Sequence, residues 1–399
     1  MKDEGNCFDN VCFPRHGSRQ REAFGVRELA SRFRPHRTVQ KRRQAGRTPK
    51  ASPRWRPELN SVPLLKYKTL GLFEKRIEGD DSLMELARLR FRQADLGAEM
   101  HGDTPEQLEQ QLRFRPAPDA PVVVHLPREL NLAEEEGRRR IAEFASRLAG
   151  RVCGLVLHDH PDLAARPGPY LHATREMAAR LEEIQARPML FIEYAAGLEP
   201  GVFARFFEEI RDLGRISACI DTGHVGIWQA RQTWSQTHPG QDVCSLKSQP
   251  PGLLGAMPEV EAAVQSALPA VLDLIGVLGS FGKSVHFHLH DGHPLSTFSP
   301  FGVSDHLSFL AEIPLPFAYQ GRRFAPLMFG PRGLQRIVAK ALEGLAPAPA
   351  SFTLEIHPTF ERLPLGDAAP LFAHWSDKTN AEMMNHWLWT LSRNHSAMG

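Results

Sequence analysis

Six short apolar segments of this chain each end at or near a histidine or an acidic residue. They are VVVH, GLVLHDH, MLFIE, SACIDTGH, VHFHLHD and FTLE, and the polar residues are His125, His160, Glu193, Asp221 with His224, His288 and Glu355. Imidazole and carboxylate groups are the usual protein ligands of Mn²⁺, Mg²⁺, Zn²⁺ and Co²⁺. If the segments are parallel strands of one barrel, their carboxyl ends meet at one rim. The pattern therefore predicts a site for one or more divalent metals, whose identity it leaves open.

Four of these residues are expected to form the core of the metal site. Glu193, Asp221, His288 and Glu355 end the last four expected strands, and two or three carboxylates with an imidazole suit a divalent metal. Asp221 and His224 lie three residues apart in the DTGH segment, so they can reach one metal or two neighbouring metals. The alternative for this pair is a helix-capping aspartate and a surface histidine.

Further histidines raise the number of metals that the site would hold. His286, His288 and His290 alternate and share one strand face, and His286 is expected deeper, as a hydrogen-bonded core histidine. His125 and His160 are superfluous for one metal but needed for two or three. Their alternative role is hydrogen bonding to substrate in a one-metal enzyme.

Two segments after the seventh strand are candidates for substrate or metal contact. SDHLSF contributes Asp305 and His306, which complete a second metal site or form a turn. FGPRG at 329–333 precedes a helix, so its amides could receive a phosphate, although a plain turn is the simpler interpretation. The nearby arginines that could assist are Arg322, Arg323 and Arg332.

Alternating strands and helices from residue 64 onward must position these groups. We expect strands at 67–73, 94–101, 122–126, 154–160, 188–194, 216–224, 284–291 and 351–357, with helices at 81–93, 104–114, 133–150, 174–187, 200–214, 258–280, 333–345 and 376–394. The first helix would be capped by Asp81 or Ser82. Continuously apolar strands are typical of parallel sheets covered on both faces. The predicted fold is a (β/α)8 TIM barrel, and a doubly wound open sheet is the alternative.

The chain divides into three expected parts. Residues 1–60 would be a disordered basic tail, because residues 1–57 carry 15 Lys/Arg against 5 Asp/Glu and few aliphatic side chains. Residues 64–365 would be the barrel, with an inserted loop over the rim at 228–258. Residues 366–399 would be a C-terminal helical extension.

Composition limits the partners and the compartment. Hydrophobic residues make up 42% and charged residues 24%, which is typical of a globular protein with a sizeable core. Beyond residue 57 the chain carries 33 Lys/Arg and 41 Asp/Glu, an acidic balance that disfavours a nucleic-acid surface. The five cysteines form no CxxC motif, and no apolar run approaches the roughly 20 residues of a membrane span. We expect a cytoplasmic protein without membrane contact.

The chain resembles the xylose-isomerase-like TIM-barrel superfamily over about residues 64–360. The resemblance rests on FIEY at Glu193, CIDTGH at Asp221 and His224, HLHD at His288 and TLEIHP at Glu355. The superfamily includes sugar isomerases and epimerases, and also the barrel-type apurinic/apyrimidinic endonucleases. The endonuclease branch has further histidines on strands three and four, which correspond to His125 and His160. Its Asp-x-His element is altered here to adjacent Asp305 and His306, without the glycine-rich context that follows in the family.

The resemblance implies two alternative functions. The first, which we favour from the sequence, is a metal-dependent sugar or sugar-phosphate isomerase or epimerase, in which Glu193 and Glu355 bind metal and move the substrate proton through an enediolate. His224 would contact this small-molecule substrate. The second is a phosphodiester or phosphate hydrolase with two or three metals, which would also allow a nucleic acid as partner. A barrel that has lost catalysis and only binds a ligand is a third alternative.

Overall fold

The structure is a computed structural model that describes residues 68–72, 79–248, 250–296, 306–310, 313–314, 324–356 and 381–398. The expected basic tail at 1–60 lies outside the described residues, as do Asp305, Arg322 and Arg323.

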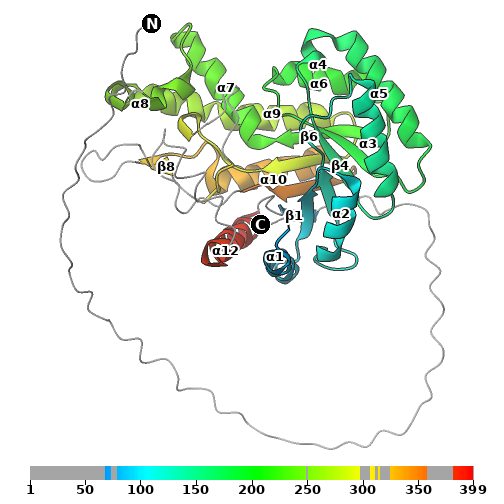
Figure 1. The fold of residues 1–399 in the computed structure, drawn as a ribbon. Coiled ribbons are helices and arrows are strands. Elements are labelled where there is room, and N and C mark those ends of the chain that lie inside the picture. The colour runs from blue at the N-terminus through cyan, green and yellow to red at the C-terminus, as the bar shows by residue number, and fades with distance from the viewer. Residues whose placement is uncertain are drawn as a thin grey trace, which may run out of the picture. The chain divides into compact units, whose positions relative to one another are not determined.

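Eight parallel strands close into a barrel in the order β1-β10-β7-β6-β5-β4-β3-β2 (Figure 1). The strands are β1 Lys68–Leu72, β2 Gly97–His101, β3 Val122–His125, β4 Gly154–His158, β5 Met189–Glu193, β6 Ile216–Asp221, β7 Val285–Leu289 and β10 Ala350–Leu354. A separate antiparallel pair, β8 Ile313–Pro314 and β9 Phe324–Ala325, lies between β7 and β10 in sequence. The closed ladder confirms the predicted TIM barrel and excludes the open sheet.

Helices follow the strands and cover the outside of the barrel. They include α1 Asp81–Gln93, α2 Pro105–Gln111, α3 Glu135–Arg147, α4 Asp162–Ala165, α5 Pro167–Glu182, α6 Pro200–Glu209, α9 Ala267–Gly279 and α10 Gly330–Leu345, with short 3-10 helices η2 Leu112–Phe114 and η4 Pro294–Ser296. The cap of α1 is Asp80, not Asp81 or Ser82, because the Asp80 carboxylate accepts hydrogen bonds from the Ser82 and Leu83 amides at 3.0 and 3.1 Å.

The expected loop at 228–258 is wrong, because this stretch is mostly helical. Helix α7 spans Thr222–Thr237, η3 spans Val243–Ser248 and α8 spans Pro250–Gln265. Asp221 starts α7 without an intervening loop, since its Oδ1 accepts the His224 amide at 2.7 Å. Apolar residues of α7 are buried against both α8 and α9, so no single amphipathic stripe marks the helix in the sequence.

Side chains inside the barrel form an apolar floor below a polar mouth. The floor consists of Leu70, Val123, Val156, Met189, Phe191 and Cys219. Because side chains alternate along a strand, the residue two positions further points to the same interior. That position holds His125 on β3, His158 on β4 and Glu193 on β5. On these strands, the inward-facing residues are therefore apolar at the floor and polar at the mouth, two positions further along.

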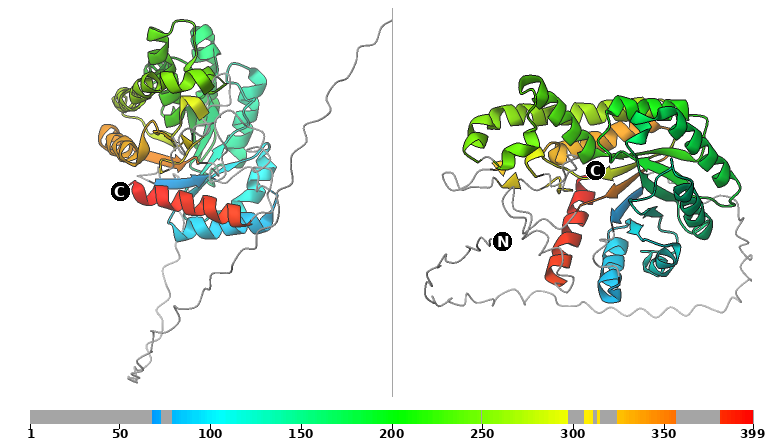
Figure 2. Two further views of the ribbon diagram at one scale, coloured as in Figure 1. Left: turned by 90° about the vertical axis from the view of Figure 1, so that its left-hand side faces the viewer. Right: turned by 45° about the horizontal axis from the view of Figure 1, so that its top comes forward.

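The C-terminal helix α12 Ala381–Ala397 belongs to the same compact unit as the barrel. It lies beside α1 (Figure 2) and also contacts α10 and β10. Trp387 anchors it, because the buried indole nitrogen donates to the Ile356 carbonyl at 2.6 Å. The predicted helix at 376–394 is confirmed from residue 381 onward.

One helical stretch, Gly252–Gly279, is long and apolar enough to cross a membrane by length and composition alone. The sequence expectation overlooked it, because α8 and α9 join into one apolar window. This is weak evidence for a span, since core helices pass the same test and α9 packs against α6, α7 and α10.

Candidate metal centre

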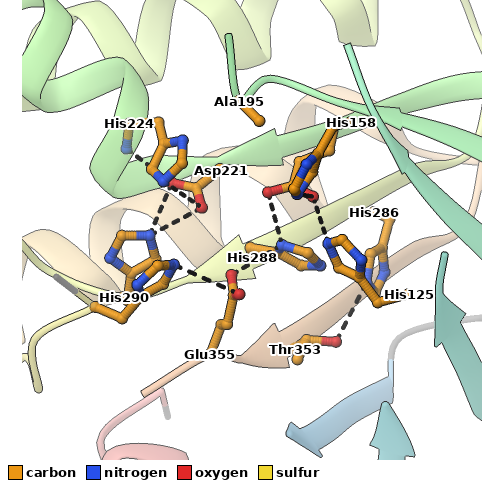
Figure 3. A network of polar contacts seen from close by, with 12 residues as sticks. His125, His158, Ala195, Asp221, His224, His286, His288, His290, Thr353 and Glu355 are labelled. Carbon is orange, nitrogen blue, oxygen red and sulfur yellow. Dashed lines mark hydrogen bonds and ion pairs between the residues drawn. The ribbon is translucent and has the colours of Figure 1, made fainter. Parts of the chain in front are cut away.

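Four residues from adjacent strands meet at the mouth as predicted. Glu193, Asp221, His288 and Glu355 are buried, and each offers a ligand atom within 4.8 Å of the others. His288 Nδ1 lies 2.9 Å from Glu355 Oε2 and 3.3 Å from Glu193 Oε1. Figure 3 shows the His288 ring and the Glu355 carboxylate facing one another. Asp221 and His288 are direct neighbours in the β6–β7 ladder, so strand register brings them together.

A second group extends the site toward β3 and β4. His125, His158 and Glu193 offer ligand atoms within 4.8 Å of one another. His125 Nε2 hydrogen-bonds Glu193 Oε2 at 2.9 Å, and His158 Nε2 lies 3.4 Å from the same oxygen. His125 thus stands where the sequence predicted, but the histidine contributed by β4 is His158.

The structure does not bring His160 into any of these groups. Strand β4 ends at His158, which pairs with Glu193 in the ladder, and the chain then turns at Pro161 into α4. His160 Nδ1 accepts the Asp162 amide at 3.2 Å, and 42% of the side chain is exposed. The alternation that we extended beyond the strand therefore fails at this turn.

A third group lies on the other side of Asp221. Asp221, His224, His290 and His306 offer ligand atoms within 4.8 Å of one another. His290 Nε2 contacts both Asp221 oxygens, at 2.8 and 2.9 Å, and Figure 3 shows Asp221 between His224 and His290. The expected His306 is present in this group, whereas Asp305 lies outside the described residues.

Burial and charge act in opposite directions on the shared carboxylates. Burial alone would raise the pKa of Glu193, but His288, His158 and His125 lower that pKa well below its ordinary value. Burial likewise opposes ionisation of Asp221, and His224 and His290 lower its pKa nonetheless. Burial lowers the pKa of His158 to about 4, so this imidazole is neutral and able to ligate a metal at neutral pH.

Buried polar atoms without partners test whether a metal fits these residues. Among the described residues, His224 Nδ1 and Nε2 are buried without a hydrogen-bond partner, and the buried His288 Nδ1 and Glu355 Oε2 meet at 2.9 Å without forming a hydrogen bond. Such groups are costly to bury unless something satisfies them. A divalent cation would accept these lone pairs, and imidazole with carboxylate is a suitable donor set. The residues present could therefore hold a metal.

A supporting layer lies directly below His288. Glu99 on β2 is fully buried, with Oε1 3.1 Å from His288 Nε2 and Oε2 3.1 Å from His286 Nε2. The Thr353 hydroxyl donates to Glu99 at 2.6 Å, and His286 Nδ1 also contacts the Ser351 hydroxyl at 2.7 Å. His286 is the bonded core histidine that we expected. Glu99 orients His288 so that Nδ1 faces the other ligands.

The FGPRG segment does not offer a free phosphate site. The buried Asp291 carboxylate accepts the Gly330 amide at 2.8 Å and the Phe329 amide at 3.2 Å. These are the amides at the start of α10 that a phosphate would need, so Asp291 already occupies them. Arg332 is exposed on the first turn of α10.

The sequence interpretation missed Glu99 and His101, and it gave no ligand role to His158 or His290, although it placed His290 on the same strand face as His288. The available signal was the strand GAEMH, which also ends in alternating acid and histidine. His101 is the ladder neighbour of His125 and its ring stacks on that histidine, with centroids 4.9 Å apart.

Comparison with known proteins leaves the family open. No family model and no curated protein matches this chain. One similar solved structure is the carboxyl transferase domain of Rhizobium etli pyruvate carboxylase with oxamate and biotin, at 12% identity and a TM-score of 0.33, covering 84% of this chain and 48% of that one. Another is a variant of the same carboxylase with the activator acetyl coenzyme A, at 12% identity and a TM-score of 0.34, covering 83% and 27%. The chain spans about half or less of these proteins, and likeness of this size indicates nothing about its activity.

Proposed function

We propose that the protein is a hydrolase of phosphate esters or phosphodiesters that uses two or three divalent metals at the barrel mouth. The observation that supports this most is that Glu193 and Asp221 each belong to two ligand groups. A carboxylate has two oxygens and can bridge neighbouring metals. Clustered metals suit phosphoryl transfer, because they neutralise charge on both the attacking and the leaving oxygen.

Glu193 and Asp221 would be the shared ligands. The other ligands would be His125 and His158 in one group, His288 and Glu355 in the central group, and His224, His290 and His306 in the third. Divalent metals held there would act as Lewis acids that stabilise negative charge on phosphoryl oxygens. The overall reaction adds water to phosphorus and breaks the phosphorus–oxygen bond, so that an alcohol leaves with one proton of the water.

Arg128 supports an anionic substrate. It lies exposed on the segment between β3 and α3, close enough to His158 for its charge to lower the pKa of that imidazole. Among the described residues, Arg128 forms no ion pair. A guanidinium beside the mouth would bind and orient a phosphate oxygen.

This proposal selects the endonuclease-like branch of the xylose-isomerase-like superfamily, which the sequence motifs suggested as the alternative. It allows nucleic acid as a substrate, whereas the basic segment 1–57 lies outside the described residues. We also propose a cytoplasmic location, consistent with Cys219 being a free thiol.

The metal-dependent sugar isomerase or epimerase is a second candidate. One observation favours it: Glu193, Asp221, His288 and Glu355 form a complete one-metal ligand set without help from the other groups. In that case Glu193 and Glu355 would move a carbon-bound proton of a sugar or sugar phosphate, and His224 would contact the substrate. It leaves the clustering of His125, His158, His290 and His306 without a role.

Metal stoichiometry with two matched variants tests the proposal. Protein purified without chelator should contain two or three metal equivalents and hydrolyse bis(p-nitrophenyl) phosphate or abasic duplex DNA. His158→Ala should lose about one equivalent, while His160→Ala, two residues away and outside every group, should keep them all. A single equivalent together with deuterium uptake by a ketose in D₂O would replace the hydrolase with the isomerase.

A further inference from the structure

A pocket of about 450 Å³ lies along helix α7, on an element that the barrel itself does not require. Its lining includes Trp228, Arg231, Gln232 and Ser235 from α7, and Gln241 and Asp242 from the turn that follows. Helices α7 and α8 are inserted between β6 and α9, on the carboxyl side of the barrel, where TIM barrels place function.

Both walls of the pocket follow candidate ligand residues along the chain, although none of those residues lines the pocket itself. His224, Trp228, Arg231 and Ser235 recur at four, seven and eleven residues, so they share one face of α7. Trp228 lies one helical turn beyond His224, a rise of about 6 Å. The opposite wall contains Gly197, four residues after Glu193 on the segment that leaves β5. The near end of the pocket, at Trp228 and Gly197, therefore lies four residues from a candidate ligand on each of two segments.

The charges of the pocket cancel. Arg231 donates two hydrogen bonds to the Asp242 carboxylate, at 3.1 and 2.8 Å. Asp242 is itself fixed, because its Oδ1 accepts the Cys244 amide at 3.1 Å at the start of η3. A neutralised guanidinium is a poor partner for a second phosphate, so the pocket suits an uncharged group.

The remaining chemistry of the lining suits a planar ring with polar edges. Trp228 is half-buried and presents an aromatic surface, on which a flat ring can stack. Gln232 and Gln241 are exposed at the pocket and each carries both a donor and an acceptor, which matches the mixed edge of a heteroaromatic base. The volume lies within the range of small-molecule sites.

We propose that this pocket is a nucleobase subsite, which binds the base of a nucleotide or nucleic acid whose phosphate lies at the metal centre. The inference rests on the proposed hydrolase function and specifies its substrate class. The Trp228 ring would stack on the base and the two glutamine amides would hydrogen-bond its edge.

Calorimetric titration of the metal-loaded protein with adenosine 5′-monophosphate and ribose 5-phosphate tests the subsite, because the two probes differ by the base. The nucleotide should bind about tenfold or more tightly. Trp228→Leu should remove this preference and leave ribose 5-phosphate binding unchanged, while Trp228→Phe should retain most of it. Gln236→Ala, on the same helix but outside the pocket lining, is the control and should change neither affinity.

Equal affinities for the two probes in the unaltered protein would overturn the subsite, as would equal losses for both probes in Trp228→Leu. Tighter binding of ribose 5-phosphate would indicate a sugar site instead and would also overturn it. The proposed function is measured separately, by hydrolysis of bis(p-nitrophenyl) phosphate. Base preference without hydrolysis would therefore refute the hydrolase while retaining the subsite, and hydrolysis without base preference would do the reverse.

Discussion

Replacing Glu99 with glutamine should weaken metal binding although Glu99 belongs to none of the ligand groups that share Glu193 and Asp221. Its carboxylate lies 3.1 Å from Nε2 of His288, whose Nδ1 faces Glu193 and Glu355. Burial alone would raise the pKa of Glu99, but His288 and His286 lower it well below its ordinary value. In the proposed metal site, Glu99 would fix the His288 ring and increase the basicity of Nδ1, the nitrogen that faces Glu193 and Glu355.

The size of the effect follows from this contact. A ring that binds metal through Nδ1 is neutral and keeps its proton on Nε2, so Glu99 contributes a hydrogen bond between a charged acceptor and this N–H, worth about 1.5 to 3 kcal/mol. Glutamine keeps an acceptor oxygen and the hydrogen bond to Thr353, so only part of this energy is lost. Removal of such supporting carboxylates typically lowers metal affinity by about 10- to 100-fold, which corresponds to about 1.4 to 2.7 kcal/mol.

Competition with a chromophoric chelator at neutral pH measures this change. Thr353→Val should weaken binding in the same direction but less, because it removes the hydrogen bonds of Thr353 to Glu99 and His286 but leaves the Glu99 carboxylate in place. The exposed Glu143→Gln is the control for loss of one negative charge. If Glu99→Gln bound metal within about twofold of the unaltered protein, Glu99 would have no positioning role and the orientation argument for His288 would be refuted.

Three further changes probe other contacts of the mouth. Gly223→Ala would place a methyl carbon 2.0 Å from the His290 ring, so it should displace that ring and lower the metal content measured by metal analysis. The control Gly255→Ala meets nothing within 4 Å and should leave the metal content unchanged. Burial raises the pKa of Asp291 to about 7, so the folded state favours the protonated carboxyl, and the stability that this contributes is lost as pH rises from about 4 to 7. Asp291→Asn should remove up to about 4 kcal/mol of this pH dependence of the unfolding free energy, measured by urea unfolding with chelator present. An unchanged dependence of the unfolding free energy on pH would contradict the raised pKa of Asp291. Arg128→Gln should raise KM for bis(p-nitrophenyl) phosphate about tenfold with little change in kcat, and Arg128→Lys should restore part of the loss; an unchanged KM would exclude Arg128 from substrate binding.

The barrel and the central ligand set could be predicted from the sequence because each depends on local pattern. Continuous apolar runs marked the strands, and polar residues at their carboxyl ends marked Glu193, Asp221, His288 and Glu355. The helical nature of 222–237 could not be predicted in the same way. Its residues are buried against several partners, so the helix lacks the single apolar face that a sequence pattern detects.

The choice between His158 and His160 shows where pattern reasoning stops. Both histidines have the same phase on β4, so alternation assigns them to one face. That phase holds only while the backbone stays extended, and β4 ends at His158 because Pro161 and α4 follow. Pairing with the neighbouring strand β5 also distinguishes the two histidines. Glu193 lies beside His158 in the ladder, and no residue of β5 lies beside His160. Which histidine joins a candidate ligand group thus depends on strand length and register, which are set by contacts between segments and not by either segment alone. Glu99 could not be predicted for the same reason. It lies on β2 and contacts His288 on β7, and β1 and β10 separate these two strands in the barrel order.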